Sequence, residues 1–390
     1  QIHVLFGVNS DSGKVPAVPD FDGYQNFLSS GKVAPEDPVL GRGTSALYQA
    51  LSTSRVIKST EEIDVMQYCA VVASNAHVEV MRNVKSMQFE FEVEAKFLYE
   101  IYRNGGCRKS AYTSICACGP NSAVLHYGHA GAPNDRMIQE GDLVLFDMGA
   151  EYHGYVSDIT CSFPVSGKFT ADHRLVYEAV LNAQRAVFAI MMPGVGWAEC
   201  HLAAEREILK ALASGGLLVN GTLDDYVNAH LGPVFFPHGL GHLIGCDTHD
   251  VGGYIHGTPE RSSRPGLSKL RTSRALENGM VLTNEPGCYF IDALLDAALA
   301  NPSQSRFIDN GVLSRFRGTG GVRLEDVVLV TYDGPQSLST CPRLVEEIED
   351  VMAGGQWPPA VDKAPELKRR WSRLAADATC MEDFTIATHQ

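Results

Sequence analysis

The amino-acid sequence predicts an α+β domain in which helices pack against an antiparallel sheet. Two observations favour this fold class: apolar residues recur at helical spacing in several long segments, and short hairpin-like strands lie between them. Composition is the third, since 45% hydrophobic and 20% charged residues are typical of a globular protein. No charge-free apolar run approaches the roughly 18 residues that span a bilayer. We therefore expect no membrane partner.

The first elements of the chain are expected to be helices. Residues 1–55 are rich in Gly, Pro, Ser and Asp, with one helix expected near residues 44–51. Ser59-Thr60-Glu61-Glu62 has the pattern of a capping box, which predicts the start of a long helix. Gly105 and Gly106 follow the next apolar stripe and predict its end. The four longest helices are therefore expected over residues 59–84, 89–103, 171–192 and 197–214.

Strand patterns interleave with these helices, at residues 143–148, 155–163, 280–283 with 289–290, and 322–331. A Gly-flanked turn joins the first two. If this turn is centred between Tyr152 and His153, Asp147 faces Asp158, and facing Cβ atoms lie about 4.5 to 5.5 Å apart. Two carboxylates that close repel, so either one is protonated or a cation lies between them. The alternative is a different register in which each Asp caps a turn.

The charge balance excludes one class of partner. The chain has 32 Lys and Arg against 46 Asp and Glu, a net charge of −14. Nucleic acid and anionic lipid both require a positive surface, so we expect binding to neither. The ten cysteines form no C-x-x-C pair, which predicts reduced thiols and a cytoplasmic protein.

Histidines gather in one Gly-rich stretch. Four of the thirteen, at positions 238, 242, 249 and 256, fall within nineteen residues. A lone histidine is more often a hydrogen-bonded core residue than a ligand, but a cluster between glycines favours a site, because glycine lets the backbone approach closely. Two further carboxylates belong to short motifs. Glu285 follows an apolar run and Glu325 shares a strand face with Arg323. The alternatives are a solvated turn for Glu285 and a surface ion pair for Glu325.

Taken together, these residues predict a metal centre. Asp147, Asp158, His242, Glu285 and Glu325 supply four carboxylates and one imidazole. Oxygen-dominated ligation with one nitrogen suits divalent ions such as Mn²⁺, Co²⁺ or Zn²⁺. A structural zinc normally takes four ligands, so five ligands favour a centre with two ions about 3.5 to 4 Å apart.

The same residues carry a resemblance to a known family. In order they are Asp147 and Asp158 with ten residues between them, Pro237-His238-Gly239-Leu240-Gly241-His242, Asn284-Glu285-Pro286-Gly287 and Gly321-Val322-Arg323-Leu324-Glu325-Asp326. Over residues 55–355 the chain resembles the pita-bread metallopeptidases, and within them it is most similar to the prolidases, which are Xaa-Pro dipeptidases. The resemblance implies a curved antiparallel sheet flanked by helices.

The resemblance also implies roles for these residues. Asp158 and Glu325 would bridge two divalent ions, with Mn²⁺ the expected metal; Asp147 would complete one metal site, and His242 and Glu285 the other. Glu285 would move the proton of the attacking water. His249 or His238 would hydrogen-bond the tetrahedral intermediate or the leaving nitrogen, and the resemblance does not divide these roles between them.

On the substrate side, the resemblance assigns Arg271 to the free carboxylate of proline, since a guanidinium binds a carboxylate bidentately. His126 would assist it, Tyr112 would close the pocket, and Arg323 would order the nearby carboxylates. The implied substrate is an Xaa-Pro dipeptide. An Xaa-Pro aminopeptidase acting on longer peptides is the alternative, and a pita-bread interaction protein without activity is a third.

The resemblance finally implies a division of the chain. Residues 1–55 would be the remnant of an N-terminal α/β domain, residues 56–355 the catalytic domain, and residues 356–390 a C-terminal extension. Relatives form dimers, so a homodimer is expected. One departure is Asn284, which stands where the family motif has an apolar residue.

Overall fold

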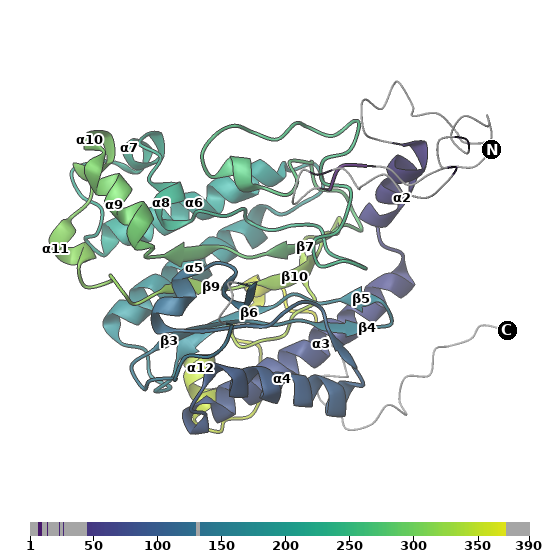
Figure 1. Cartoon of the computed structure of the whole chain (residues 1–390), viewed down its shortest axis with the longest axis horizontal. Helices are drawn as coiled ribbons and strands as arrows, with labels where there is room; N and C mark the ends of the chain where they lie inside the picture. The colour runs from purple at the N-terminus through teal and green to yellow at the C-terminus, as the bar shows by residue number, and fades with distance from the viewer. Residues whose placement is uncertain are drawn as a thin grey trace.

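The computed structural model describes residues 45–129 and 133–371, together with residues 7–9, 14, 23 and 26. Its strands cross the middle of the molecule, between α3 and α4 on one side and α5 and α6 on the other (Figure 1). The helices are α2 (Ala46–Val56), α3 (Thr60–Asn83), α4 (Glu90–Gly105), α5 (Ala171–Ile190), α6 (Trp197–Ser214), α7 (Leu223–Asn228), α8 (Gly232–Phe235), α9 (Asp292–Ala300), α10 (Pro302–Ser305), α11 (Asn310–Leu313) and α12 (Val345–Met352). The strands are β1 (Lys109–Ser110), β2 (Ile115–Cys118), β3 (Leu143–Asp147), β4 (Ala150–Tyr152), β5 (Tyr155–Val156), β6 (Thr160–Pro164), β7 (Val281–Asn284), β8 (Gly287–Tyr289), β9 (Gly321–Arg323), β10 (Asp326–Leu329) and β11 (Gln336–Ser337).

The four longest predicted helices are confirmed as α3 to α6. The capping box forms as expected, because the Ser59 amide donates to Glu62 Oε2 at 2.7 Å and the Glu62 amide donates to Ser59 Oγ at 3.3 Å. At the end of α4, Gly106 has a φ of 61°, the left-handed conformation that glycine adopts without strain. Local capping chemistry therefore sets where these helices begin and end.

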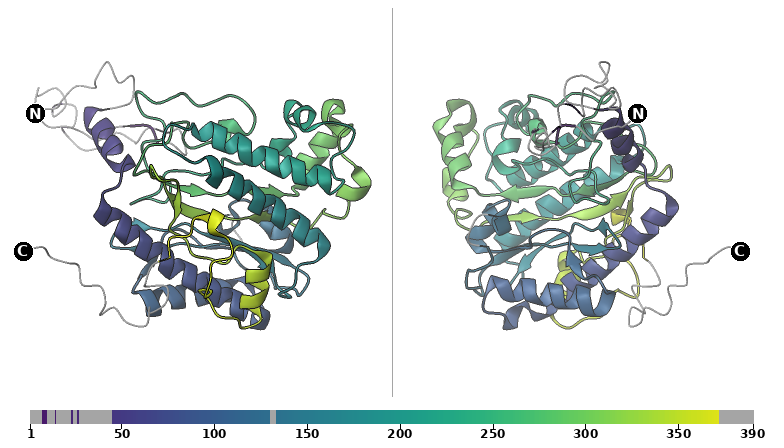
Figure 2. Two further views of the ribbon diagram at one scale, coloured as in Figure 1. Left: turned by 180° about the vertical axis from the view of Figure 1, so that it is seen from behind. Right: turned by 45° about the vertical axis from the view of Figure 1, so that its right-hand side comes forward.

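The helices cover the sheets in two pairs. Helix α3 contacts β4 and β5, α4 contacts β2, and α5 contacts β8 and β9. Helices α5 and α6 lie side by side, as both views of Figure 2 show. The core includes Trp197 at the start of α6 and the edge-to-face pair of Phe146 and Phe163, whose ring centroids are 5.5 Å apart. The chemistry-bearing strands are thus held between rigid helical layers.

The paired strands are antiparallel and form sheets of order β1-β4-β5, β2-β3-β6, β11-β10-β7 and β8-β9. The predicted antiparallel sheet is therefore confirmed, but the predicted hairpin register is wrong. Tyr152 pairs with Tyr155, so Asp147 lies opposite Thr160. The physical reason is the turn: His153 and Gly154 have φ values of 49° and 82°, and a two-residue hairpin turn of this kind requires positive φ at both central residues.

The long predicted strands are interrupted. The predicted strand 155–163 divides into β5 and β6, and 322–331 divides into β9 and β10. The pairing keeps its register through the first gap, where the Met148 amide donates to the Ile159 carbonyl at 3.1 Å. Candidate ligands lie at these gaps: Asp158 between β5 and β6, Glu325 between β9 and β10, and Glu285 between β7 and β8. These three residues therefore lie between regular strand segments rather than within them.

Much of the predicted N-terminal segment 1–55 and residues 372–390 fall outside the described residues. Beyond residue 355 the described chain is ordered against the domain, since Arg369 is buried and pairs with Glu347 at 2.8 Å. The domain boundaries at 55 and 355 stay predictions. Within the described residues, no helix combines the length and the apolar character needed to traverse a bilayer.

Candidate metal centre

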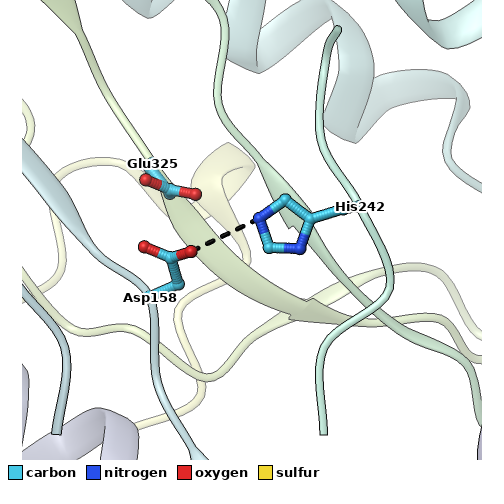
Figure 3. A group of neighbouring side chains, drawn as sticks. All are labelled: Asp158, His242 and Glu325. Carbon is cyan, nitrogen blue, oxygen red and sulfur yellow. Dashed lines mark ion pairs between the residues drawn. The ribbon is translucent and has the colours of Figure 1, made fainter. Parts of the chain in front are cut away.

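Three predicted ligands come together between the sheets: Asp158, His242 and Glu325 (Figure 3). One ligand atom from each lies within 4.8 Å of the other two. Their relative exposures are 5%, 3% and 1% respectively. Buried charged groups are costly unless they are paired or bind a cation, so this arrangement requires an explanation beyond packing.

The backbone fixes the orientation of His242. Its Nδ1 lies 3.0 Å from the Leu243 carbonyl, which can only accept, so Nδ1 carries the proton and Nε2 faces the cluster. Nε2 is 3.3 Å from Asp158 Oδ2 and 3.5 Å from Glu285 Oε1. A backbone carbonyl that selects the tautomer of a histidine in this way is the usual support of a metal-ligating imidazole.

Glu285 is oriented by its neighbour in β7. The Thr283 hydroxyl donates to Glu285 Oε1 at 3.1 Å and accepts from the His242 amide at 3.1 Å. The segment that carries His242 can approach β7 this closely because the residue before His242 is Gly241. A Cβ atom at Gly241 would lie 2.0 Å from the Thr283 carbonyl oxygen. Glu285 and His242 therefore share one hydrogen-bonded frame.

Asp147 joins the cluster through Tyr112 and Arg323. The Tyr112 hydroxyl lies 2.5 Å from Asp147 Oδ1 and 2.6 Å from Asp158 Oδ1, so the two carboxylates meet although they are not directly paired. The second oxygen of Asp147 accepts from Arg323 Nη2 at 2.5 Å. Burial, together with the charge of Asp147, raises the pKa of Tyr112 well above its ordinary value, which keeps the hydroxyl proton in place.

The electrostatics of the cluster show an excess of negative charge. Burial raises the pKa of Glu325 well above its ordinary value, and the charges of Asp158, Glu285 and Asp147 add to this shift. Burial and Asp158 likewise raise the pKa of Asp147 to about 7, against the opposing charge of Arg323. Each carboxyl resists ionisation first because it is buried and then because its neighbours are carboxylates.

Asp158 and His242 behave in the opposite way, as an ion pair. Burial disfavours the charge of Asp158, but the hydrogen bond and charge of His242 leave its pKa below the ordinary value. Burial also opposes protonation of His242, yet the hydrogen bond to Asp158 and the charge of Glu285 raise its pKa to about 9. The imidazolium partly compensates the carboxylates. Carboxylate oxygens with one imidazole are the donors that divalent ions prefer, so the residues present fit such an ion.

A hydrogen-bonded chain leads from the cluster to His238. Arg323 Nη1 donates to the Tyr289 hydroxyl at 2.9 Å, and this hydroxyl lies 2.8 Å from His238 Nε2. His238 Nδ1 donates to the Gly239 carbonyl at 2.8 Å and is 3.9 Å from Glu285 Oε2. Burial and the charge of Arg323 lower the pKa of His238 to about 3, so the ring is neutral at neutral pH. Sequence reasoning missed Tyr289, whose only signal was its place two strand positions after Gly287.

His249 lies against His242, with ring centroids 4.5 Å apart and planes at 82°. Burial and the charge of His242 lower the pKa of His249 to about 4, so it too is neutral. Arg271 is half-buried, and burial lowers its pKa against the opposing charge of Glu285. His126 is exposed, and its charge contributes to lowering the pKa of His238. The structure thus brings Asp158, His242 and Glu325 together, whereas His126 and Arg271 are linked to the site through their electrostatic effects with His238 and Glu285.

Comparison with known proteins gives a consistent picture. Residues 64–332 match the model of metallopeptidase family M24. The chain is 53% identical to the Xaa-Pro dipeptidase of Homo sapiens over 350 residues, covering 90% of this chain and 68% of that protein. It is 38% identical to a probable Xaa-Pro aminopeptidase of Aspergillus niger over 316 residues, covering 80% of this chain and 66% of that protein.

Two solved structures are also similar. The aminopeptidase PepP of Pseudomonas aeruginosa has a TM-score of 0.66 and 37% sequence identity, covering 79% of this chain and 62% of that one. The zinc-substituted aminopeptidase P of E. coli in complex with product has a TM-score of 0.65 and 33% identity, with the same coverage of 79% and 62%. This chain therefore spans less than two thirds of the length of these solved chains.

Proposed function

Because the chain belongs to metallopeptidase family M24, we propose that it is a metal-dependent dipeptidase that hydrolyses Xaa-Pro dipeptides. The resemblance to pita-bread metallopeptidases and the corresponding fold are confirmed by the family model and the similar structures. One observation carries the proposal: Asp158, His242 and Glu325 form a buried, metal-compatible cluster in a chain 53% identical to an Xaa-Pro dipeptidase.

Membership of this family implies divalent metal ions. We propose two ions per chain, with Mn²⁺ as the metal, held jointly by Asp158 and Glu325; Asp147 completes one site and His242 with Glu285 the other. When bound, such ions would lower the pKa of water towards neutrality and polarise the scissile carbonyl. The protein's own residues supply orientation and proton transfer.

Glu285 is placed to handle the proton of the attacking water. Its two oxygens are distinct: Oε1 is held by Thr283, and Oε2 faces His238 at 3.9 Å. A carboxylate fixed in this way accepts a proton and returns it to the leaving proline nitrogen, as general acid–base catalysis requires. The neutral ring of His249 or of His238 hydrogen-bonds the tetrahedral intermediate or the leaving nitrogen, and His238 does so only by exchanging its contact with the Gly239 carbonyl or the Tyr289 hydroxyl.

Arg271 and His126 recognise the substrate in this proposal. The Xaa-Pro bond is a tertiary amide without N–H, so the enzyme cannot hold the substrate by a backbone donor at proline. A dipeptide instead offers a free carboxylate. The half-buried guanidinium of Arg271 binds this carboxylate, His126 assists from the opposite side, Tyr112 closes the pocket, and Arg323 orders Asp147.

An aminopeptidase that accepts longer Xaa-Pro peptides is the second candidate, because the two similar solved structures are aminopeptidases. Gly-Pro and Gly-Pro-Pro separate the candidates. We expect Gly-Pro to be cleaved and Gly-Pro-Pro to be spared, with activity lost after chelation and restored by Mn²⁺. Metal analysis by mass spectrometry should find two ions per loaded chain. Cleavage of Gly-Pro-Pro alone, or activity indifferent to the chelator, would contradict the proposal.

We also propose a cytoplasmic homodimer in which residues 56–355 form the catalytic domain. The excess of acidic residues supports a soluble, non-nucleic-acid-binding enzyme. Sedimentation of the purified chain measures the oligomeric state directly, and a monomer at micromolar concentration would contradict the dimer.

A further inference from the structure

A second group of buried charges lies beside the metal centre, at the junction of α2 and α3. Lys58 and Asp250 are 6% and 5% exposed, and Lys58 Nζ lies 3.3 Å from Asp250 Oδ2. Arg55 Nη2 lies 2.5 Å from the other oxygen, Oδ1. One buried carboxylate is therefore held by two cations that come from a different part of the chain.

The geometry of this ion pair leaves little freedom. Gly245 packs against the Lys58–Asp250 contact, since a Cβ atom there would lie 2.5 Å from Asp250 Oδ2 and 3.2 Å from Lys58 Nζ. The carboxylate also accepts from the Val251 amide at 2.9 Å, and the Lys58 amide donates to the Gly279 carbonyl at 2.9 Å. A buried ion pair with satisfied hydrogen bonds fixes the relative position of the two segments that carry it. Separating the segments would leave a buried charge without a partner on each of them.

The loop fixed by Asp250 is the one that supports the metal centre. The Asp250 amide donates to the Leu243 carbonyl at 2.9 Å, the same carbonyl that accepts from His242 Nδ1 at 3.0 Å. The residue before Asp250 is His249, whose ring packs edge-on against His242. Asp250 is thus one residue from a proposed catalytic group, and its backbone amide is two hydrogen bonds from a proposed ligand, through the shared Leu243 carbonyl.

We propose that Asp250, held by Lys58 and Arg55, is a positioning residue that keeps the His249 ring over the reacting centre. This inference rests on the proposed function, in which His249 hydrogen-bonds the intermediate. In this proposal, Arg55 and Lys58 at the junction of α2 and α3 determine the position of the His249 ring through their contacts with Asp250. A displacement of His249 by about 1 Å suffices to cost about a hundredfold in rate.

The chain offers a matched control for the test. Arg55 also pairs at 2.6 Å with Asp247, whose side chain is 61% exposed. Asp250→Asn and Asp247→Asn each remove one carboxylate from the same guanidinium. Since Asp250→Asn leaves Lys58 buried without a partner, the double variant Lys58→Met/Asp250→Asn, which removes both buried charges, is tested beside it.

Two readouts distinguish positioning from general stabilisation. In hydrogen exchange of the metal-loaded chain, we expect the double variant to exchange at least about tenfold faster over residues 246–253, and Asp247→Asn to match the native chain. For Gly-Pro, we expect kcat to fall about 10- to 100-fold with KM within about twofold and metal content unchanged. Native exchange over residues 246–253 would overturn the proposal, as would loss of metal, which would place the effect at His242.

A double-mutant cycle completes the test. If the ion pair acts through His249, adding Lys58→Met/Asp250→Asn to His249→Ala should lower kcat by less than about twofold. If the combined variant instead shows a loss of kcat equal to the product of the losses in the two separate variants, the proposal is overturned. Absence of Gly-Pro hydrolysis by the native chain would instead defeat the proposed function, while the exchange measurement would still decide whether Asp250 holds the loop.

Discussion

Arg323 Nη2 lies 2.5 Å from Asp147 Oδ2, so a cation on β9 orders the carboxylate at the end of β3. This contact is buried and joins two separate sheets. It opposes the effects of burial and of Asp158, which together raise the pKa of Asp147 to about 7. Arg323 therefore helps to keep this carboxylate ionised and available to a cation.

Replacing Arg323 by Gln should weaken metal binding most strongly at neutral pH. Without the guanidinium the pKa of Asp147 rises further, so a larger fraction is protonated at pH 7. We expect Mn²⁺ affinity to fall roughly 10- to 100-fold at pH 7 and to recover in part at pH 9. Isothermal titration calorimetry measures both. Arg174→Gln, which removes an exposed pair with Glu346, should leave the affinity unchanged.

Metal affinity should itself depend on pH. His242 has a pKa of about 9 and Asp147 one of about 7 in the metal-free chain, and both must lose their protons to bind an ion. Protons therefore compete with the metal below these values. Mn²⁺ affinity should rise between pH 6 and pH 9, by up to about tenfold per pH unit for each of the two protons displaced, and should therefore rise most steeply below pH 7, in titrations at constant ionic strength. An affinity that stays flat over this interval would contradict the proposed ligand set.

Arg271→Ala should raise KM for Xaa-Pro dipeptides. A charge-assisted pair with the substrate carboxylate contributes about 1.5 to 3 kcal/mol, which corresponds to roughly 10- to 100-fold in KM. Steady-state kinetics with Gly-Pro measure the change. The control is Arg274→Ala in the same loop, whose guanidinium pairs with Glu277 and should leave KM within about twofold. An unchanged KM in Arg271→Ala would remove Arg271 from the substrate site.

Gly241→Ala should separate His242 from Thr283. The new methyl group would lie 2.0 Å from the Thr283 carbonyl oxygen, which belongs to the backbone and cannot rotate away. We expect the free energy of unfolding to fall by about 1 to 3 kcal/mol and the metal content to fall with it. Urea denaturation and metal analysis measure the two effects. Gly141→Ala, where no atom lies within 4 Å of the new Cβ, should change stability by less than about 0.5 kcal/mol.

Much of the fold could be predicted because its signals are local. The capping residue Ser59 and the glycines after α4 act within one turn of the chain, so their effect is visible in the sequence. Strand β2 was not predicted, since Ile115–Cys118 is buried on both faces and carries no alternation. The hairpin register was wrong by two residues because the turn type depends on the φ values of His153 and Gly154.

In the candidate site, too, residues in local sequence motifs could be predicted, and residues that act through distant partners could not. The five proposed ligands belong to short motifs and could be predicted as a group, and three of them lie within 4.8 Å of one another. The supporting residues could not. Tyr289 and Thr160 act only through partners distant in sequence, since Tyr289 accepts from Arg323 and the Thr160 hydroxyl donates to Glu325 at 2.7 Å. Nothing in their own segments distinguishes them from ordinary strand residues.

The turn between β4 and β5 has a consequence for how this chain can vary. Side chains alternate between the two faces of a strand, so inserting or deleting a single residue in the turn would move Asp158 to the opposite face from Asp147. The identities of His153 and Gly154 are constrained mainly by their positive φ values at the tip of the hairpin, although the His153 ring also packs against Tyr152. Their number is constrained by the face on which Asp158 must lie. In evolutionary terms, selection should tolerate other residues with positive φ at these two positions and should reject any change in the length of the turn.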